Sequence, residues 1–182
     1  MARIEPIEEA KVHGPIRDAL AEVVAAHGRA TNMKRTLARS PVALRSLMTW
    51  YDLRGEVAAF LGDRATLLFA HAISTGTDCL ICSTFFRRLL IDAGDNPDDP
   101  RLDDRETLVV EFGRQLARDP HGVSDDLFAR LASVFDSDQI VALTAFAGLM
   151  VATNLFNNAL RVDLDEYLWS YRKTGATGEV HP

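Results

Sequence analysis

The 182-residue chain contains two cysteines, Cys79 and Cys82, which are separated by two apolar residues. Positions i and i+3 of a helix share one face. This spacing brings the two Cα atoms close to the separation of about 4.4–6.8 Å that a disulfide requires. The N-terminus of a helix also favours a thiolate, because its free N–H groups and its dipole stabilise negative charge. Two thiols at this spacing therefore predict a redox-active pair at the start of a helix.

The elements that must position these thiols are expected to be helices. Apolar residues recur with helical periodicity along the chain, and strand signals are nearly absent. Ser40 followed by Pro41 is typical of a helix start, Asp63, Ser124 and Ser137 are expected to cap later helices, and Asp78 is expected to cap the cysteine helix. The predicted all-α fold has helices at residues 15–27, from 41 onward, 56–61, 64–75, 79–94, 103–117, 125–134, 138–160 and 164–171.

Composition limits the function classes. The net charge is −6, with 20 basic and 26 acidic residues, which argues against nucleic-acid binding because that function needs a basic face. The length predicts one helical domain over residues 1–182, with residues 172–182 as a flexible tail. We see no secretory signal, and the longest apolar stretch, residues 140–152, is too short to span a bilayer. A cytoplasmic protein without membrane partners is expected.

The apolar stripe of the 138–160 helix continues into two asparagines, Asn154 and Asn158. Inward-facing amides need hydrogen-bond partners. Those partners are either backbone groups or groups across a subunit contact, or else the two amides line a pocket near the cysteines.

Several segments together resemble the carboxymuconolactone decarboxylase superfamily, on its alkylhydroperoxidase D-like side. They are residues 32–41, the stretch 64–94 that carries Cys79 and Cys82, and residues 103–106, 123–124, 135–138 and 154–160, so that the resemblance spans about residues 30–166. It implies a helical bundle that assembles as a trimer or hexamer. It also implies that Cys82 attacks a peroxide, that Cys79 resolves the sulfenic acid into a disulfide, and that a dithiol protein then reduces the pair.

The chain departs from the family pattern at two positions. The usual glutamate, twelve residues before the first cysteine, is Leu67, and the usual histidine, four residues after the second, is Phe86. His71 lies one turn beyond Leu67 on the same helix face and is a candidate base, since imidazoles titrate near neutrality. The alternative is a buried histidine bonded to a backbone carbonyl. The helix dipole favours a thiolate at Cys79, whereas the resemblance favours attack by Cys82, which we adopt.

Other functions fit the residues less well. Zinc needs four ligands, or three and a water. Cys79, Cys82 and His71 could supply three, but a histidine that precedes the pair on another helix is not a known spacing, so we predict no metal and no cofactor. A decarboxylase-type enzyme would use histidine and carboxylate groups without thiols, and a catalytically silent relative would serve as an oligomeric binding scaffold. The sequence favours a homo-oligomeric thiol–disulfide oxidoreductase that acts on small peroxides or disulfides.

Overall fold

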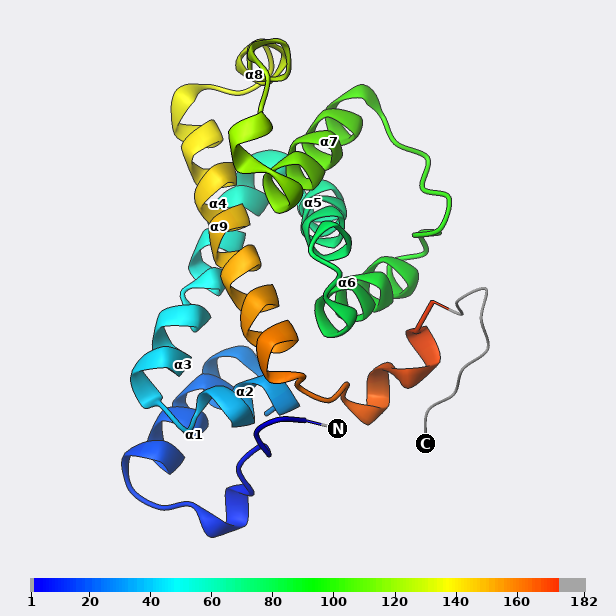
Figure 1. The fold of residues 1–182 in the computed structure, drawn as a ribbon. Coiled ribbons are helices and arrows are strands. Elements are labelled where there is room, and N and C mark those ends of the chain that lie inside the picture. The colour runs from blue at the N-terminus through cyan, green and yellow to red at the C-terminus, as the bar shows by residue number, and fades with distance from the viewer. Residues whose placement is uncertain (1, 174–182) are drawn as a thin grey trace.

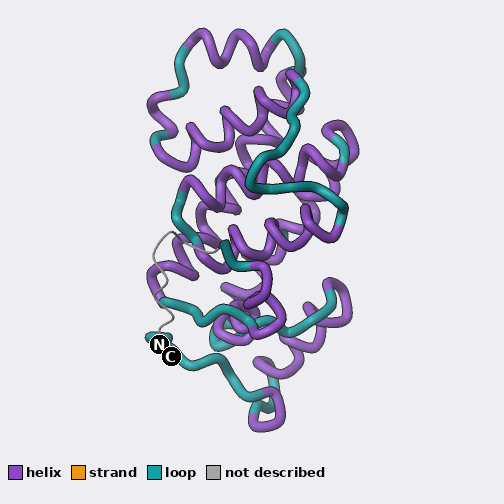
Figure 2. Tube along the Cα trace, turned by 90° about the vertical axis from the view of Figure 1, so that its right-hand side faces the viewer, coloured by secondary structure: helices purple, strands orange, loops and turns teal. Residues whose placement is uncertain are grey.

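The computed structural model describes residues 2–173, and within that range the chain is a bundle of helices without strands (Figures 1 and 2). The α-helices are α1 (Pro15–His27), α2 (Asn32–Leu37), α3 (Pro41–Met48), α4 (Trp50–Leu61), α5 (Asp63–Gly76), α6 (Leu80–Asp92), α7 (Asp104–Arg118), α8 (Asp125–Ala132) and α9 (Ser137–Leu160). Three 3₁₀ helices are η1 (Glu9–Lys11), η2 (Pro120–Gly122) and η3 (Glu166–Tyr171). The all-α prediction is confirmed.

Helix α5 is the centre of the bundle, and most of its residues are buried, as is typical of a helix that is apolar on nearly all sides. It packs most extensively against α7 and α6, and it also contacts α4 and α9. Two glycines allow α7 to approach closely. A Cβ on Gly113 of α7 would lie 2.8 Å from the ring of Phe69, and a Cβ on Gly76 would lie 2.7 Å from the Ala117 side chain. Larger residues there would force α5 and α7 apart.

Helix α9 is the second long support of the fold. It crosses the molecule in Figure 1 and packs against α4, α5 and α7. It is long and apolar enough to cross a bilayer by length and composition, as is the central helix of many globular bundles. Its N-terminus carries a capping box in which Asp136 and Gln139 bond to each other's backbone N–H groups. The predicted cap, Ser137, is instead the first residue of the helix.

The structure corrects several other helix boundaries. The segment after Ser40 is two helices, because the chain bends at Thr49 between α3 and α4. Helix α4 is longer than the predicted 56–61, and α2 was not predicted. Asp63 caps nothing and is instead paired with Arg54 at 3.1 Å, whereas Ser124 caps α8 as expected.

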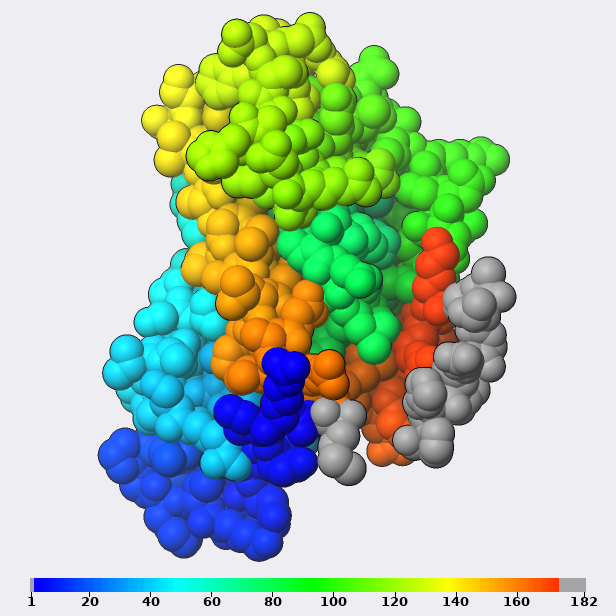
Figure 3. Space-filling view, in the orientation of Figure 1, coloured from blue at the N-terminus to red at the C-terminus, as the bar shows by residue number. Residues whose placement is uncertain are grey.

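The C-terminal part of the described chain returns to α6. Helix η3 packs against α6, and Figure 3 shows this red segment beside the green helices. Asp165, just before η3, accepts a hydrogen bond of 2.9 Å from the backbone N–H of Asn32 on α2. This bond joins the C-terminal segment before η3 to the N-terminal helix α2. The predicted flexible tail, apart from Arg172 and Lys173, lies outside the described residues.

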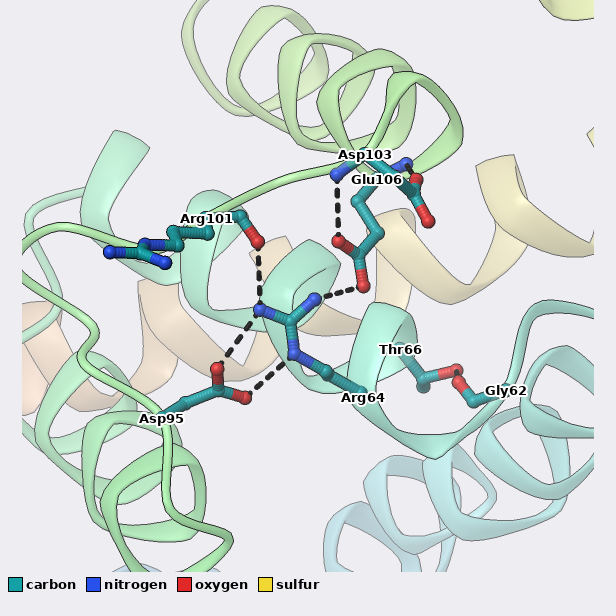
Figure 4. Close-up of polar contacts among 7 residues, drawn as sticks. All are labelled: Gly62, Arg64, Thr66, Asp95, Arg101, Asp103 and Glu106. Carbon is teal, nitrogen blue, oxygen red and sulfur yellow. Dashed lines mark hydrogen bonds and ion pairs between the residues drawn. The ribbon is translucent and has the colours of Figure 1, made fainter.

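One arginine joins the three segments around the long α6–α7 connection (Figure 4). The Arg64 guanidinium donates two hydrogen bonds to Asp95, at 2.8 and 2.9 Å, one to Glu106, and one to the Arg101 carbonyl at 3.1 Å. Glu106 is buried and also completes the capping box of α7 with Asp103. The two carboxylates hold the pKa of Arg64 above its usual range. This bidentate network fixes the connection against α5.

Replacing Arg64 with alanine is expected to lower the free energy of unfolding by about 2–3 kcal/mol, because the buried Glu106 carboxylate loses its counterion. Urea denaturation followed by circular dichroism measures this change. Arg130→Ala is the matched control, since Arg130 pairs with Glu111 at an exposed site and such pairs contribute roughly 0–1 kcal/mol. Equal losses in the two variants would contradict a structural role for the Arg64 network.

Candidate redox site

The two cysteines lie where α5 turns into α6. Asp78 adopts a left-handed conformation with φ of 52°, which an aspartate tolerates better than most residues. The turn ends α5, and Cys79 itself becomes the N-cap of α6. The prediction that Asp78 caps this helix is therefore wrong. The Cys79 sulfur takes the capping place and accepts the Cys82 backbone N–H at 3.4 Å.

Both sulfur atoms are free thiols and both are buried, Cys79 being 1% and Cys82 6% exposed. They are hydrogen-bonded to each other, so their titrations are linked. The bond from the Cys82 thiol, together with the Cys82 backbone N–H, lowers the pKa of Cys79. The same bond, together with burial, raises the pKa of Cys82. The pair therefore holds a single negative charge most easily on Cys79, at the helix N-terminus.

Three amides of α9 reach this turn. Asn154 donates to the Thr77 hydroxyl at 2.7 Å, and Asn158 donates to the Thr77 carbonyl at 2.9 Å. Asn157 donates to the Cys82 sulfur at 3.2 Å and to the Met33 sulfur at 3.5 Å. Asn154 and Asn158 thus hold Thr77, two residues before Cys79, by its side chain and by its backbone carbonyl respectively. The amide that meets a cysteine is their neighbour Asn157.

His71 is half-buried on α5. Burial lowers its pKa to about 4, and the positive charges of Arg87 and Arg114 add to this effect. The imidazole is therefore neutral at physiological pH. The structure records no hydrogen bond between His71 and either cysteine within residues 2–173, and His71 does not line the cavity beside Cys82. Its assignment as the base stays a prediction.

The two residues at the family's proton-relay positions are buried and apolar. Leu67 belongs to the main core. Phe86 packs with Trp50, the ring centroids being 6.0 Å apart. Neither side chain can donate or accept a proton, so any proton transfer must use other groups.

A cavity of about 420 Å³ reaches Cys82. Its walls come from the end of α1, from α2, α3, α4, α6 and α9, and from η3. Five aromatic residues line it: Trp50, Tyr51, Phe85, Phe86 and Tyr167. Its lining includes exposed Arg29 as well as the buried Cys82 sulfur. A small molecule can therefore approach Cys82 from solvent, whereas Cys79 is not part of the lining.

Sequence reasoning missed Asn157 and the cavity. Asn157 follows Met150 and Asn154 at helical spacing on one buried face of α9. The helical periodicity alone could therefore have predicted that Asn157 is buried. The cavity had no such signal, because its residues come from segments that are far apart in the chain.

No protein-family model matches the chain. It is 33% identical over 73 residues to the uncharacterized protein YnjA of Escherichia coli K12, and this match spans 40% of each protein. Among solved structures, an uncharacterized peroxidase-related protein from Ralstonia eutropha JMP134, described as an alkylhydroperoxidase D core, superposes with a TM-score of 0.71 at 18% identity, covering 92% of this chain and 94% of that one. The debrominase Bmp8, without ligand, superposes with a TM-score of 0.73 at 13% identity, covering 92% and 95%.

These structural matches extend over nearly the whole chain. At such low identity they establish architecture alone. The chain has the alkylhydroperoxidase D-like fold.

Proposed function

We propose that the protein is a thiol–disulfide oxidoreductase that reduces small peroxides through Cys82 and Cys79. The observation that carries this proposal is the pair itself: two hydrogen-bonded thiols at a helix N-terminus, one of which lines a cavity. The likeness to a peroxidase-related structure supports it. Cys82 is the attacking residue because a substrate in the cavity meets its sulfur and not that of Cys79.

The first step needs a thiolate at Cys82. The pair with one proton carries its charge on Cys79, and transfer of the Cys82 proton across the hydrogen bond moves that charge to Cys82, where the Asn157 N–H stabilises it. The Cys82 sulfur attacks a peroxide oxygen, the O–O bond breaks, and a sulfenic acid and an alkoxide form. The Cys79 thiol gives its proton to the alkoxide, which leaves as an alcohol.

The second step closes the disulfide. The Cys79 thiolate attacks the sulfur of the Cys82 sulfenic acid and displaces hydroxide. One thiolate, one thiol and one peroxide have then become one disulfide, one alcohol and one hydroxide, which becomes water by taking up the proton that was released when the pair ionised. A dithiol protein reduces the disulfide and restores the pair. In this scheme the pair acts as its own acid and base, which compensates for Leu67 and Phe86.

We expect the reduced protein to consume one equivalent of tert-butyl hydroperoxide and to lose both titratable thiols. Cys82→Ser is expected to consume none. Cys79→Ser is expected to stop at a sulfenic acid on residue 82, because the resolving sulfur is gone. Peroxide assays and mass spectrometry after dimedone trapping measure these outcomes. A dimedone label confined to Cys79 in the Cys82→Ser variant would reverse the roles of the two cysteines. An unchanged thiol count in the wild-type protein after peroxide treatment would disprove the proposed enzymatic activity.

Asn157→Ala is expected to raise the apparent pKa of the attacking Cys82 thiolate by about 1 unit, because a hydrogen bond to a charged group is lost. The pH dependence of iodoacetamide labelling, resolved by peptide mass spectrometry, measures this shift. Asn158→Ala is the matched control, since the Asn158 amide donates to the Thr77 carbonyl and to neither cysteine sulfur within residues 2–173. The same titration curve for Asn157→Ala and wild type would remove Asn157 from the mechanism.

The role of His71 is tested through pH. Above pH 6.5 its imidazole is neutral in both the folded and unfolded chains. Between pH 6.5 and about 4 only the unfolded chain takes up the proton, so the free energy of unfolding decreases as the pH is lowered through this range. His71→Gln is expected to remove this acid-dependent loss of stability, which amounts to at most about 3 kcal/mol. It is also expected to leave peroxide consumption at pH 7.5 within about twofold of wild type, because the cysteine pair supplies its own acid and base. A loss of activity of about a hundredfold or more would restore His71 as the base.

We also propose a cytoplasmic homo-oligomer. An exposed face of α9 carries small and apolar residues in a regular spacing, with Val141, Gly148 and Leu155 among them. A second copy would cover this face. Light scattering on the wild type and on Leu155→Glu tests the idea, which fails if both are monomers.

A second candidate is reductive dehalogenation of an aromatic ring. The aromatic walls beside Cys82 favour it, and the structural neighbour Bmp8 is a debrominase whose structure was also solved with 2,3,4-tribromopyrrole. Cys82 would take the halogen from the ring, the ring would take a proton, and Cys79 would displace halide to form the disulfide. Release of bromide from a brominated pyrrole by reduced protein, without peroxide consumption, would favour this reaction.

A further inference from the structure

The cavity beside Cys82 is strongly asymmetric in charge. Four cationic residues line it, namely Arg29, Lys34, Arg54 and Arg88, and the only acidic residue in its lining is Asp165. Burial raises the pKa of Asp165, whose carboxylate already accepts the Asn32 N–H. Arg54 is paired with Asp63 at 3.1 Å. Arg88 lies 3.9 Å from the Asp92 carboxylate, whereas Arg29 and Lys34 make no ion pair with any carboxylate that the structure describes, so the lining keeps a net positive charge.

Lys34 is the most constrained of these cations. It is 3% exposed, and its ammonium donates to the carbonyls of His27 and Gly28 at 3.2 and 3.3 Å. It makes no ion pair with a carboxylate among residues 2–173. An ammonium has three donors and is costly to bury without an opposite charge. Its ammonium also lies 5.5 Å from the centroid of the Tyr51 ring. Its remaining donor, and a charge that no carboxylate of the described residues balances, favour an anionic partner in the cavity.

Two further polar groups of the lining lack protein acceptors. The indole N–H of Trp50 and the Nε of Arg88 are buried, and neither has a hydrogen-bond partner in the described part of the chain. Buried donors of this kind are rare in folded proteins and are normally satisfied. Both donors belong to residues that line the cavity.

The apolar part of the lining is largely aromatic. Tyr51 stacks on His27 with the ring centroids 3.9 Å apart, and Arg29 lies 4.2 Å above the Tyr167 ring. Flat aromatic walls favour a planar aromatic guest. A volume of about 420 Å³ lies near the lower end of small-molecule sites, which suits a compound of up to about two fused rings.

We propose that this cavity binds a planar aromatic anion, whose negative group is held by Lys34, Arg88 and the Trp50 N–H and whose ring faces Cys82. The inference deepens the proposed function and rests on it, because it names the class of compound that would carry the peroxide group. An aromatic hydroperoxide with a carboxylate would be reduced in preference to a neutral or aliphatic one.

Isothermal titration calorimetry with three non-reactive probes tests this binding. Sodium 2-naphthoate supplies the ring and the charge, 2-naphthamide lacks the charge, and decahydronaphthalene-2-carboxylate lacks the aromatic ring. We expect 2-naphthoate to bind at least about tenfold more tightly than either analogue. Equal affinities for 2-naphthoate and 2-naphthamide, or no binding of 2-naphthoate, would overturn the proposal.

Variants assign the contacts. Arg88→Met and Trp50→Phe keep most of the side-chain volume and are expected to weaken 2-naphthoate binding by about tenfold and about threefold. Lys34→Gln is expected to weaken it further, and Arg88→Met keeps the test valid if Lys34→Gln does not fold. Arg130→Met is the matched control, because Arg130 lies outside the cavity, and it should bind as the wild type does. Wild-type affinity in folded Arg88→Met and Trp50→Phe would refute the assignment.

Failure of this inference can be told apart from failure of the proposed function. Reduction of tert-butyl hydroperoxide without inhibition by 2-naphthoate would refute the aromatic site and leave the peroxidase intact. Tight 2-naphthoate binding to a protein that consumes no peroxide would keep the site and refute the peroxidase. Competitive inhibition of peroxide reduction by 2-naphthoate is the result that supports both.

Discussion

The site depends on the way in which α9 holds the turn between α5 and α6. Asn154 and Asn158 both bond to Thr77, and Asn157 bonds to the Cys82 sulfur. These contacts are made by one helix, so the backbone conformation of the turn and the environment of the Cys82 sulfur are set together. The left-handed conformation of Asp78 then brings Cys79 to the N-cap of α6. A shift of α9 would disturb all of these features at once.

Charge and access are divided between the two sulfurs. Helix geometry favours negative charge on Cys79, whereas the cavity reaches Cys82. A proton shared between hydrogen-bonded thiols reconciles the two, because moving it by one hydrogen bond transfers the charge to the accessible sulfur. In the proposed mechanism such a pair needs no external base, which would explain why Leu67 and Phe86 can stand where the family resemblance predicts a glutamate and a histidine. The aromatic residue at position 86 also contributes to the wall of the cavity.

The fold class and the proximity of the two thiols could be predicted from the sequence, because both follow from local residue spacing. Helical periodicity is a property of each segment, and two cysteines three residues apart share a face wherever a helix begins. The assignment of Asp78 as the cap failed because the turn takes a left-handed conformation that bonds from α9 support. The charge environment of His71 and the cavity around Trp50 also come from packing between distant segments. Tertiary contacts of this kind leave no pattern within a single segment.

The most direct test of the account is a redox titration of the purified protein in glutathione or dithiothreitol buffers, followed by mass spectrometry of alkylated peptides. The account predicts a single two-electron transition between two free thiols and an intramolecular Cys79–Cys82 disulfide, fully reversible on reduction. Thiols that stay free at every potential, or a disulfide that forms only between chains, would contradict it.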